Sequence, residues 1–233
     1  MEKEYNSGIL IRAITAFVII LPLFLIIYLE NTALFVSAII LVCFYSQYEW
    51  IINKFEYPII FGFFLIFICF GLGIVYPFLH YENLLNLEIN LNFFRTHATL
   101  FYLFLIVVLN TALFDTFAYL VGSNFGKTPI APRISPNKTY EGLIGGFLFN
   151  IIFGIAFCNF LSLSYMYILC FVIGGFLAFI GDLFISAQKR KKGIKDTGNI
   201  LPGHGGMLDR LDSHLLATPV TLWSIFILEK LLS

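Results

Sequence analysis

Long, continuously apolar segments alternate with short polar ones along most of this chain. Seven segments are candidates for crossing a bilayer: 9–29, 33–48, 58–79, 100–120, 143–161, 165–180 and 215–228. A helix needs about 20 mostly apolar residues to span the hydrocarbon core, and backbone in that environment must satisfy its own hydrogen bonds. The runs lack the two-residue alternation of membrane strands. The pattern predicts an all-α, polytopic integral membrane protein with about seven transmembrane helices, a count that holds within one or two because three runs are short.

The composition agrees with a bilayer setting. Of the 233 residues, 59% are hydrophobic and 12% are charged, whereas a soluble domain has roughly 25% charged residues. The first run is too long for the core of a signal peptide and is followed by further spans. The four cysteines lie inside apolar runs, so we expect free, small hydrophobic side chains. Without an internal repeat or a flexible linker, residues 1–233 are expected to form one membrane domain.

Positive charge falls on one side of the predicted helices. If the N-terminus is cytoplasmic, seven spans place all but Arg95 and Lys230 of the 14 Lys and Arg residues on the inner side. This bias matches the positive-inside rule. Two inner loops, 122–142 and 181–213, hold nearly all of the Gly, Pro, Lys, Asp and Ser that a phosphate site would need. The chemistry is therefore expected on the cytoplasmic side.

The loop 181–213 combines carboxylates with basic residues. Asp182 and Ser186 are one helical turn apart, and Asp209 and Asp212 are three residues apart, so each pair is expected to share a helix face. Mg²⁺ is usually bound by one or two carboxylates, with water and substrate phosphate as the other ligands. Two such faces that converge would form a metal–nucleotide site.

The basic residues of this loop divide into two groups. Lys191 and Lys192 are interpreted as anchors to lipid head groups, a common role of lysines next to a membrane. Lys189, Arg190 and Lys195 are interleaved with the acids, which an anchor does not need. These three are therefore expected near phosphates.

Two acidic residues occur at the edge of or within apolar runs. Asp115 lies inside one, where a carboxylate is costly unless it faces a partner or a water-filled cavity. It is a functional candidate, with a structural hydrogen bond between helices as the alternative. Glu49 and Trp50, at the inner end of the second run, are interpreted as an interfacial anchor.

Three short motifs do not support the enzymes they suggest. The stretch 122–128 is one residue short of a Walker A loop and follows a membrane span instead of a strand. The spacing of Ser135 and Lys138 fits the Ser-x-x-Lys pattern of penicillin-recognising enzymes. That pattern alone is too loose to identify such an enzyme. The string at 204–206 is typical of hydrolase oxyanion loops, but the chain has no accompanying Gly-x-Ser-x-Gly elbow.

Taken together, the inner loops closely resemble the phosphatidate cytidylyltransferase (CDP-diacylglycerol synthase) family. The main match is the segment 186–212. It contains the motifs Lys189-Arg190, Lys195-Asp196, Leu201-Pro202, His204-Gly205-Gly206 and Asp209-Arg210. Further matches are Arg12 to Ala16, Glu49-Trp50, Asp115, Ala118-Tyr119, Gly122, 125–127 and 135–142. The chain looks shorter than typical bacterial members.

The resemblance implies transfer of the cytidylyl group of CTP to phosphatidate, which gives CDP-diacylglycerol and pyrophosphate for phospholipid biosynthesis. It implies Mg²⁺, with a second cation left open. The residues that correspond to catalytic positions are Asp182, Ser186, Lys189, Lys195 and Asp209; those for substrate binding are Lys127, Ser135, Lys138, Thr139, Arg190, His204 and Arg210; those for metal are Asp182, Asp209, Asp212 and Asp115.

The implied partners are CTP, phosphatidate and the lipid bilayer, without nucleic acid, and a homodimer is left open. The absence of a targeting segment favours a bacterial inner membrane as the location. Two other classes stay open: a CTP-dependent polyprenol or dolichol kinase, which would release CDP, and an ion or proton transporter centred on Asp115. The Asp-x-x-Asp-Gly-x-x-Ala-Arg signature of CDP-alcohol phosphotransferases is absent from the sequence.

Overall fold

A computed structural model describes residues 21–22, 24–80, 97–200 and 205–232. Six helical stretches in these ranges are long and apolar enough to cross a membrane: Thr32–Ile52, Pro58–Leu79, Leu100–Phe125, Tyr140–Leu161, Tyr167–Lys191 and Leu208–Leu232. They correspond to the last six of the seven predicted runs. Most of the first run, 9–29, lies outside the described residues. The prediction of an all-α, polytopic membrane protein is confirmed.

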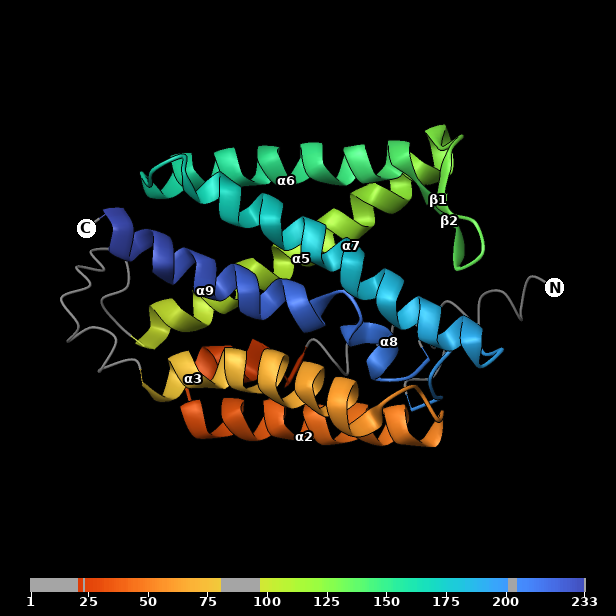
Figure 1. The fold of residues 1–233 in the computed structure, drawn as a ribbon. Coiled ribbons are helices and arrows are strands. Elements are labelled where there is room, and N and C mark those ends of the chain that lie inside the picture. The colour runs from red at the N-terminus through yellow and green to blue at the C-terminus, as the bar shows by residue number, and fades with distance from the viewer. Residues whose placement is uncertain (1–20, 23, 81–96, 201–204, 233) are drawn as a thin grey trace, which may run out of the picture.

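The elements follow one another as α2 (Thr32–Ile52), two π-helical stretches η1 (Pro58–Gly62) and η2 (Phe64–Leu72), α3 (Gly73–Leu79), α5 (His97–Phe125), α6 (Tyr140–Leu161), α7 (Tyr167–Lys191), α8 (Leu208–Leu211) and α9 (His214–Leu232). In Figure 1, α5, α6 and α7 form one side of the molecule, α2 and α3 form the other, and α9 runs between them. The helices lie largely along one direction, as expected for a bundle that spans a bilayer.

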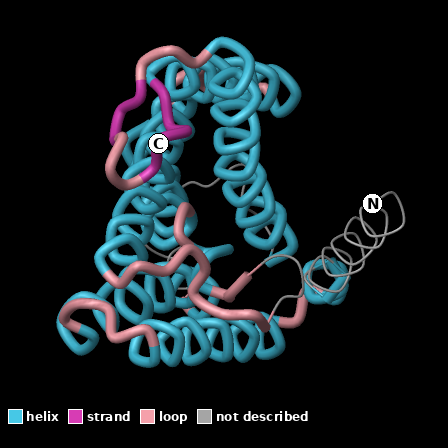
Figure 2. Tube along the Cα trace, turned by 90° about the vertical axis from the view of Figure 1, so that its right-hand side faces the viewer, coloured by secondary structure: helices cyan, strands magenta, loops and turns pink. Residues whose placement is uncertain are grey.

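One small sheet was not predicted from the sequence. Strands β1 (Pro129–Ala131) and β2 (Ser135–Thr139) pair antiparallel between α5 and α6, with Ala131 opposite Ser135 and Pro129 opposite Thr139. Figure 2 shows this hairpin at one end of the bundle. Its strands are too short to produce a recognisable alternation, so the sequence pattern predicted only a loop there.

Close packing of α6 on α5 depends on a glycine. A Cβ atom at Gly142 would lie 2.6 Å from the backbone oxygen of Ala118. Small residues allow transmembrane helices to approach closely, and van der Waals packing then holds them together where water supplies no hydrophobic drive. Gly142 therefore sets the separation of the two helices beside the hairpin.

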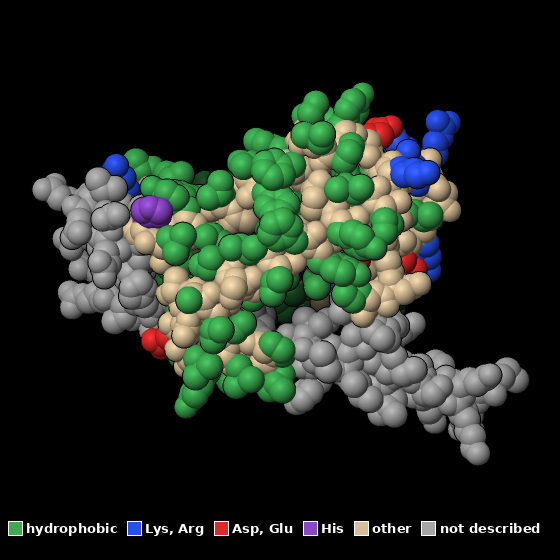
Figure 3. Space-filling model, turned by 90° about the horizontal axis from the view of Figure 1, so that it is seen from below, with side chains coloured by type: hydrophobic (Ala, Val, Ile, Leu, Met, Phe, Trp, Pro, Cys, Tyr) green, Lys and Arg blue, Asp and Glu red, His purple; other side chains and the backbone are tan. Residues whose placement is uncertain are grey.

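Charge is concentrated at one end of the bundle. Figure 3 shows hydrophobic side chains over much of one face, with Lys and Arg gathered mainly at the end that carries the hairpin. The last turn of α7 contains Lys189, Arg190 and Lys191, which also complement the negative end of the helix dipole. This polar end is where the predicted site residues of α7 and α8 lie.

The variant Gly142→Ala should lower the melting temperature of the detergent-solubilised protein by about 5 °C, because overpacking a well-packed contact costs roughly 1–3 kcal/mol. Leu148→Ala on the same helix is the control, since Leu148 is 56% exposed on the apolar surface. Equal melting temperatures for the two variants, measured by a thermal shift assay, would contradict the role of Gly142.

Candidate functional site

A polar cavity of about 360 Å³ lies where α5, β2, the start of α6, α7 and the α8–α9 region meet. Segments nearly one hundred residues apart in the sequence contribute to its wall. Eight residues predicted from the sequence line it: Asp115, Ser135, Lys138, Thr139, Asp182, Asp209, Arg210 and Asp212. The two inner loops, whose polar residues suggested a common site, are therefore brought together.

Besides Asp209 of α8, three carboxylates line this cavity from three different elements. Asp115 comes from α5, Asp182 from α7 and Asp212 from the turn between α8 and α9. They are close enough for their charges to repel one another, an arrangement that is costly in a partly buried site unless positive charge is nearby. Oxygen ligands of this kind suit a hard divalent cation.

Asp182 already has two partners within the protein. The Ser186 hydroxyl donates to its Oδ1 at 3.1 Å, which confirms that the two side chains share a face of α7. The Lys138 ammonium of β2 lies 2.5 Å from Oδ2. The hairpin thus delivers a lysine to the carboxylate of a helix, a contact that the sequence spacing does not reveal.

Asp209 is more completely bonded than Asp182. Its Oδ1 accepts a hydrogen bond from Lys189 Nζ at 2.8 Å, and its Oδ2 accepts from the backbone N–H groups of Thr197 (2.7 Å) and Gly206 (2.9 Å). Lys189 Nζ also lies 3.8 Å from Asp212 Oδ2, as expected if the two aspartates share a face. Asp209 therefore fixes a lysine and two loop segments.

The predicted metal role of these aspartates stays a prediction. In the part of the chain that the structure describes, no three His, Cys, Asp or Glu side chains lie together in a way that could hold a metal ion. Mg²⁺ needs only one or two carboxylates when water and substrate phosphate supply its other ligands. The donor chemistry of Asp115, Asp182 and Asp212 fits that mode of binding better than a cage made of protein alone.

Several predicted phosphate ligands lie outside the cavity wall. The side chains of Lys127 and Lys195 are exposed. The guanidinium of Arg190 donates to the backbone oxygens of Ile134 (3.1 Å) and Ile194 (2.9 Å), so it ties the hairpin turn to the end of α7. His204 lies outside the described residues. Lys127, Arg190 and Lys195 do not line this cavity, and the substrate roles predicted for all four residues stay predictions.

Thr139 has a local role that explains its position. Its side chain is buried, and Oγ1 accepts a hydrogen bond from the N–H of Gly142 at 3.1 Å as the N-cap of α6. An N-cap hydroxyl satisfies one of the free N–H groups at a helix start. Thr139 therefore supports the wall as well as lining it.

The interpretation of Glu49 and Trp50 as an interfacial anchor is wrong. Trp50 has no exposed surface, and its ring packs edge-on against Phe55. Glu49 is 2% exposed and accepts hydrogen bonds from Thr197, Met207 and Leu208. The signal that could have identified Glu49 is the one used for Asp115: a carboxylate next to apolar residues needs a partner.

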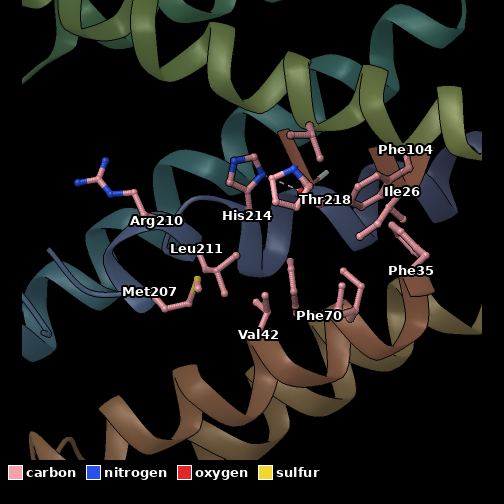
Figure 4. A pocket seen from close by; sticks show the side chains of 14 residues that line it. Ile26, Phe35, Val42, Phe70, Phe104, Met207, Arg210, Leu211, His214 and Thr218 are labelled. Carbon is pink, nitrogen blue, oxygen red and sulfur yellow. Dashed lines mark hydrogen bonds between the residues drawn. The ribbon is translucent and has the colours of Figure 1, made fainter. Parts of the chain in front are cut away.

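A second, apolar cavity of about 330 Å³ shares one lining residue with the polar one. Side chains of α2, η2, α5 and α9 line it, among them Phe35, Phe70 and Phe104 (Figure 4). Arg210 lines both cavities, and in Figure 4 its guanidinium points away from the apolar side chains. The arrangement places a positive charge at the boundary between a polar and an apolar space.

Comparison with known proteins connects this geometry to a family. Residues 52–228 match the model of the cytidylyltransferase family. A protein of Aquifex aeolicus named phosphatidate cytidylyltransferase is 33% identical over 94% of this chain and 89% of its own length. Proteins of the same name from Thermotoga maritima and Bacillus subtilis are 42% and 46% identical over 54% and 45% of this chain. These two matches span 49% and 40% of the relatives' own lengths.

The variant Thr139→Ala should lower the melting temperature by about 3 °C, because loss of an N-cap costs roughly 1 kcal/mol. Thr139→Ser keeps the hydroxyl and should melt within a degree or so of the wild type. A thermal shift assay on both variants checks the capping role, and an alanine variant as stable as the serine variant would refute it.

Proposed function

The chain belongs to the cytidylyltransferase family, and we propose that it transfers the cytidylyl group of CTP to phosphatidate, giving CDP-diacylglycerol and pyrophosphate. The observation that carries this proposal is the junction of the two cavities at Arg210. Phosphatidate is a glycerol that carries one phosphate and two acyl chains. It therefore needs a polar and an apolar space side by side. The names of the relatives and the resemblance of segment 186–212 support the same reaction.

The proposed reaction needs no covalent intermediate with the enzyme. A phosphate oxygen of phosphatidate attacks the α-phosphorus of CTP and forms the new P–O bond. The bond between the α-phosphorus and the bridging oxygen breaks in line, and pyrophosphate leaves with that oxygen and its electron pair. Catalysis is then mostly a matter of positioning the two phosphates and neutralising their charge.

The residues of the polar cavity are suited to that task. Lys138, held beside Asp182 by its ion pair, supplies positive charge for the triphosphate. Arg210 is placed to hold the lipid phosphate while acyl chains occupy the apolar cavity. Ser186 orients Asp182 through its hydrogen bond, and Lys189 keeps Asp209 and Asp212 at the wall.

We assign the Mg²⁺ contacts to Asp182 with Asp115 or Asp212, the carboxylates that face the cavity from separate elements. When bound, the metal ion would neutralise phosphate charge. Asp209 is a further ligand only if its Oδ1 is shared with Lys189. The four aspartates of the cavity wall carry one more charge than Lys138, Lys189 and Arg210 together, which supports the option of a bound cation beyond the first only when substrate phosphates add further negative charge.

The proposed location of the protein rests on its apolar helices and on the distribution of its basic residues. The six apolar helices in the described part of the chain support an integral membrane protein, and the basic residues at the hairpin end support a cytoplasmic site in a bacterial inner membrane through the positive-inside rule. Extensive packing among the described helices supports a single domain over residues 1–233. The homodimer stays a prediction.

The first test is pyrophosphate release by the purified protein in detergent with CTP and Mg²⁺, with and without phosphatidate, and with the lipid product identified by mass. Release that depends on phosphatidate and on Mg²⁺, together with CDP-diacylglycerol, is the expected result. If phosphatidate gives no pyrophosphate while a polyprenol added in its place yields CDP and a phosphorylated polyprenol, the proposal is overturned in favour of a kinase. Ion flux in proteoliposomes without CTP would favour a transporter.

The variant Asp182→Asn should lower kcat by about 100-fold or more, since the amide keeps the shape but loses the charge that a cation and Lys138 require. Lys191→Ala is the matched control. Lys191 is exposed and pairs with Glu56 at 2.7 Å, away from the cavity, so its loss should change kcat by less than twofold. Asp182→Asn activity within a few fold of the wild type would remove Asp182 from the site.

A further inference from the structure

Glu49 is a buried carboxylate that the proposed reaction does not use. It lies near the end of α2, is 2% exposed and does not line the polar cavity. Its Oε2 accepts hydrogen bonds from Thr197 Oγ1 and from the N–H of Leu208, both at 2.8 Å, and its Oε1 accepts from the N–H of Met207 at 2.9 Å. One side chain thus bonds to two segments of the chain, 197–198 and 206–208.

The two segments are shaped around this carboxylate. A Cβ atom at Gly206 would lie 2.6 Å from both oxygens of Glu49, and a Cβ atom at Gly198 would lie 2.8 Å from Oε1. Glycine is needed at both positions because the backbone approaches the carboxylate so closely. The Asn53 side chain, one turn further along, donates to the backbone oxygens of Glu49 (2.8 Å) and Thr197 (2.6 Å) and joins the same contact.

Asp209 holds the same two segments through other atoms. The N–H groups of Thr197 and Gly206 donate to Asp209 Oδ2, while the hydroxyl of Thr197 donates to Glu49. Asp209, which lines the polar cavity, in turn accepts a hydrogen bond from Lys189. The hydrogen bonds therefore run without a break from Glu49 on α2, through Thr197 and Asp209, to Lys189 on α7.

We propose that Glu49 is a positioning residue that clamps segments 197–198 and 206–208 to α2 and thereby fixes Asp209 and Lys189 at the polar cavity. The kinetic part of this inference rests on the proposed function. The physical reason is that a buried carboxylate leaves donors unsatisfied when it is lost, and each buried unsatisfied donor costs free energy. Without Glu49, the backbone N–H groups of Met207 and Leu208 and the hydroxyl of Thr197 lose their acceptor.

The variant Glu49→Gln tests the clamp with little change of shape. In either orientation, its NH₂ group faces a backbone N–H donor, that of Met207 or that of Leu208. We expect kcat/KM for CTP to fall at least tenfold, mainly through a higher KM. Partial unfolding would instead lower kcat through a smaller active fraction and leave KM unchanged. Glu56→Gln is the control and should match the wild type, since Glu56 is a half-buried glutamate that lines neither cavity.

A second pair of variants guards against misfolding of Glu49→Gln. Thr197→Val removes only the hydroxyl that donates to Glu49, whereas Thr197→Ser keeps it. The valine variant should reproduce the rise in KM for CTP, and the serine variant should restore it to within about twofold of the wild type. A valine variant with normal kinetics would overturn the inference.

Hydrogen exchange of the full chain in detergent separates this inference from the proposed function. In Glu49→Gln, the amides of residues 206–208 should exchange faster than in the wild type. If the wild type releases no pyrophosphate with phosphatidate but exchange still accelerates, the clamp is supported and the proposed reaction fails. If the wild type is active while Glu49→Gln keeps normal kinetics and exchange, the clamp is overturned and the reaction stands.

Discussion

Buried carboxylates are the constraint on which the polar end of this bundle depends. A negative charge within an apolar helix bundle must find hydrogen-bond donors or positive charge, because the bilayer supplies neither. Asp182 finds Ser186 and Lys138, and Asp209 finds Lys189 with two backbone N–H groups. These requirements bring the hairpin and the segment before α8 back against the helices.

The resulting polar cavity is assembled from distant parts of the chain. Each wall depends on a different local feature: a helix cap at Thr139, a glycine contact at Gly142 and a lysine delivered by β2. Apolar packing holds these pieces in register, since α6 can pack on α5 only where small residues allow close approach. Stability and site geometry are therefore coupled.

The junction of the cavities suggests how one site can act on a water-soluble nucleotide and a lipid. Arg210 stands at that junction, with carboxylates on its polar side and aromatic side chains on the other. A reaction between CTP and phosphatidate needs such a boundary, because the acyl chains are stable only in an apolar space while the two phosphates must meet in a polar one. Glu49 on α2 bonds to the N–H of Met207, a residue that lines the apolar cavity, and so extends this coupling to the helices on the other side of the bundle.

The sequence by itself determined the membrane class, six of the described spans and the two loops that carry the chemistry, because hydropathy and charge are local properties of the chain. It also paired Asp182 with Ser186, since a spacing of four residues on a helix fixes a shared face. Only the tertiary structure decided that Glu49 is buried, that Thr139 caps a helix and that Arg190 bonds to backbone outside the cavity. Those contacts join residues through helix packing, and hydropathy carries no information about which distant donor a buried carboxylate will meet.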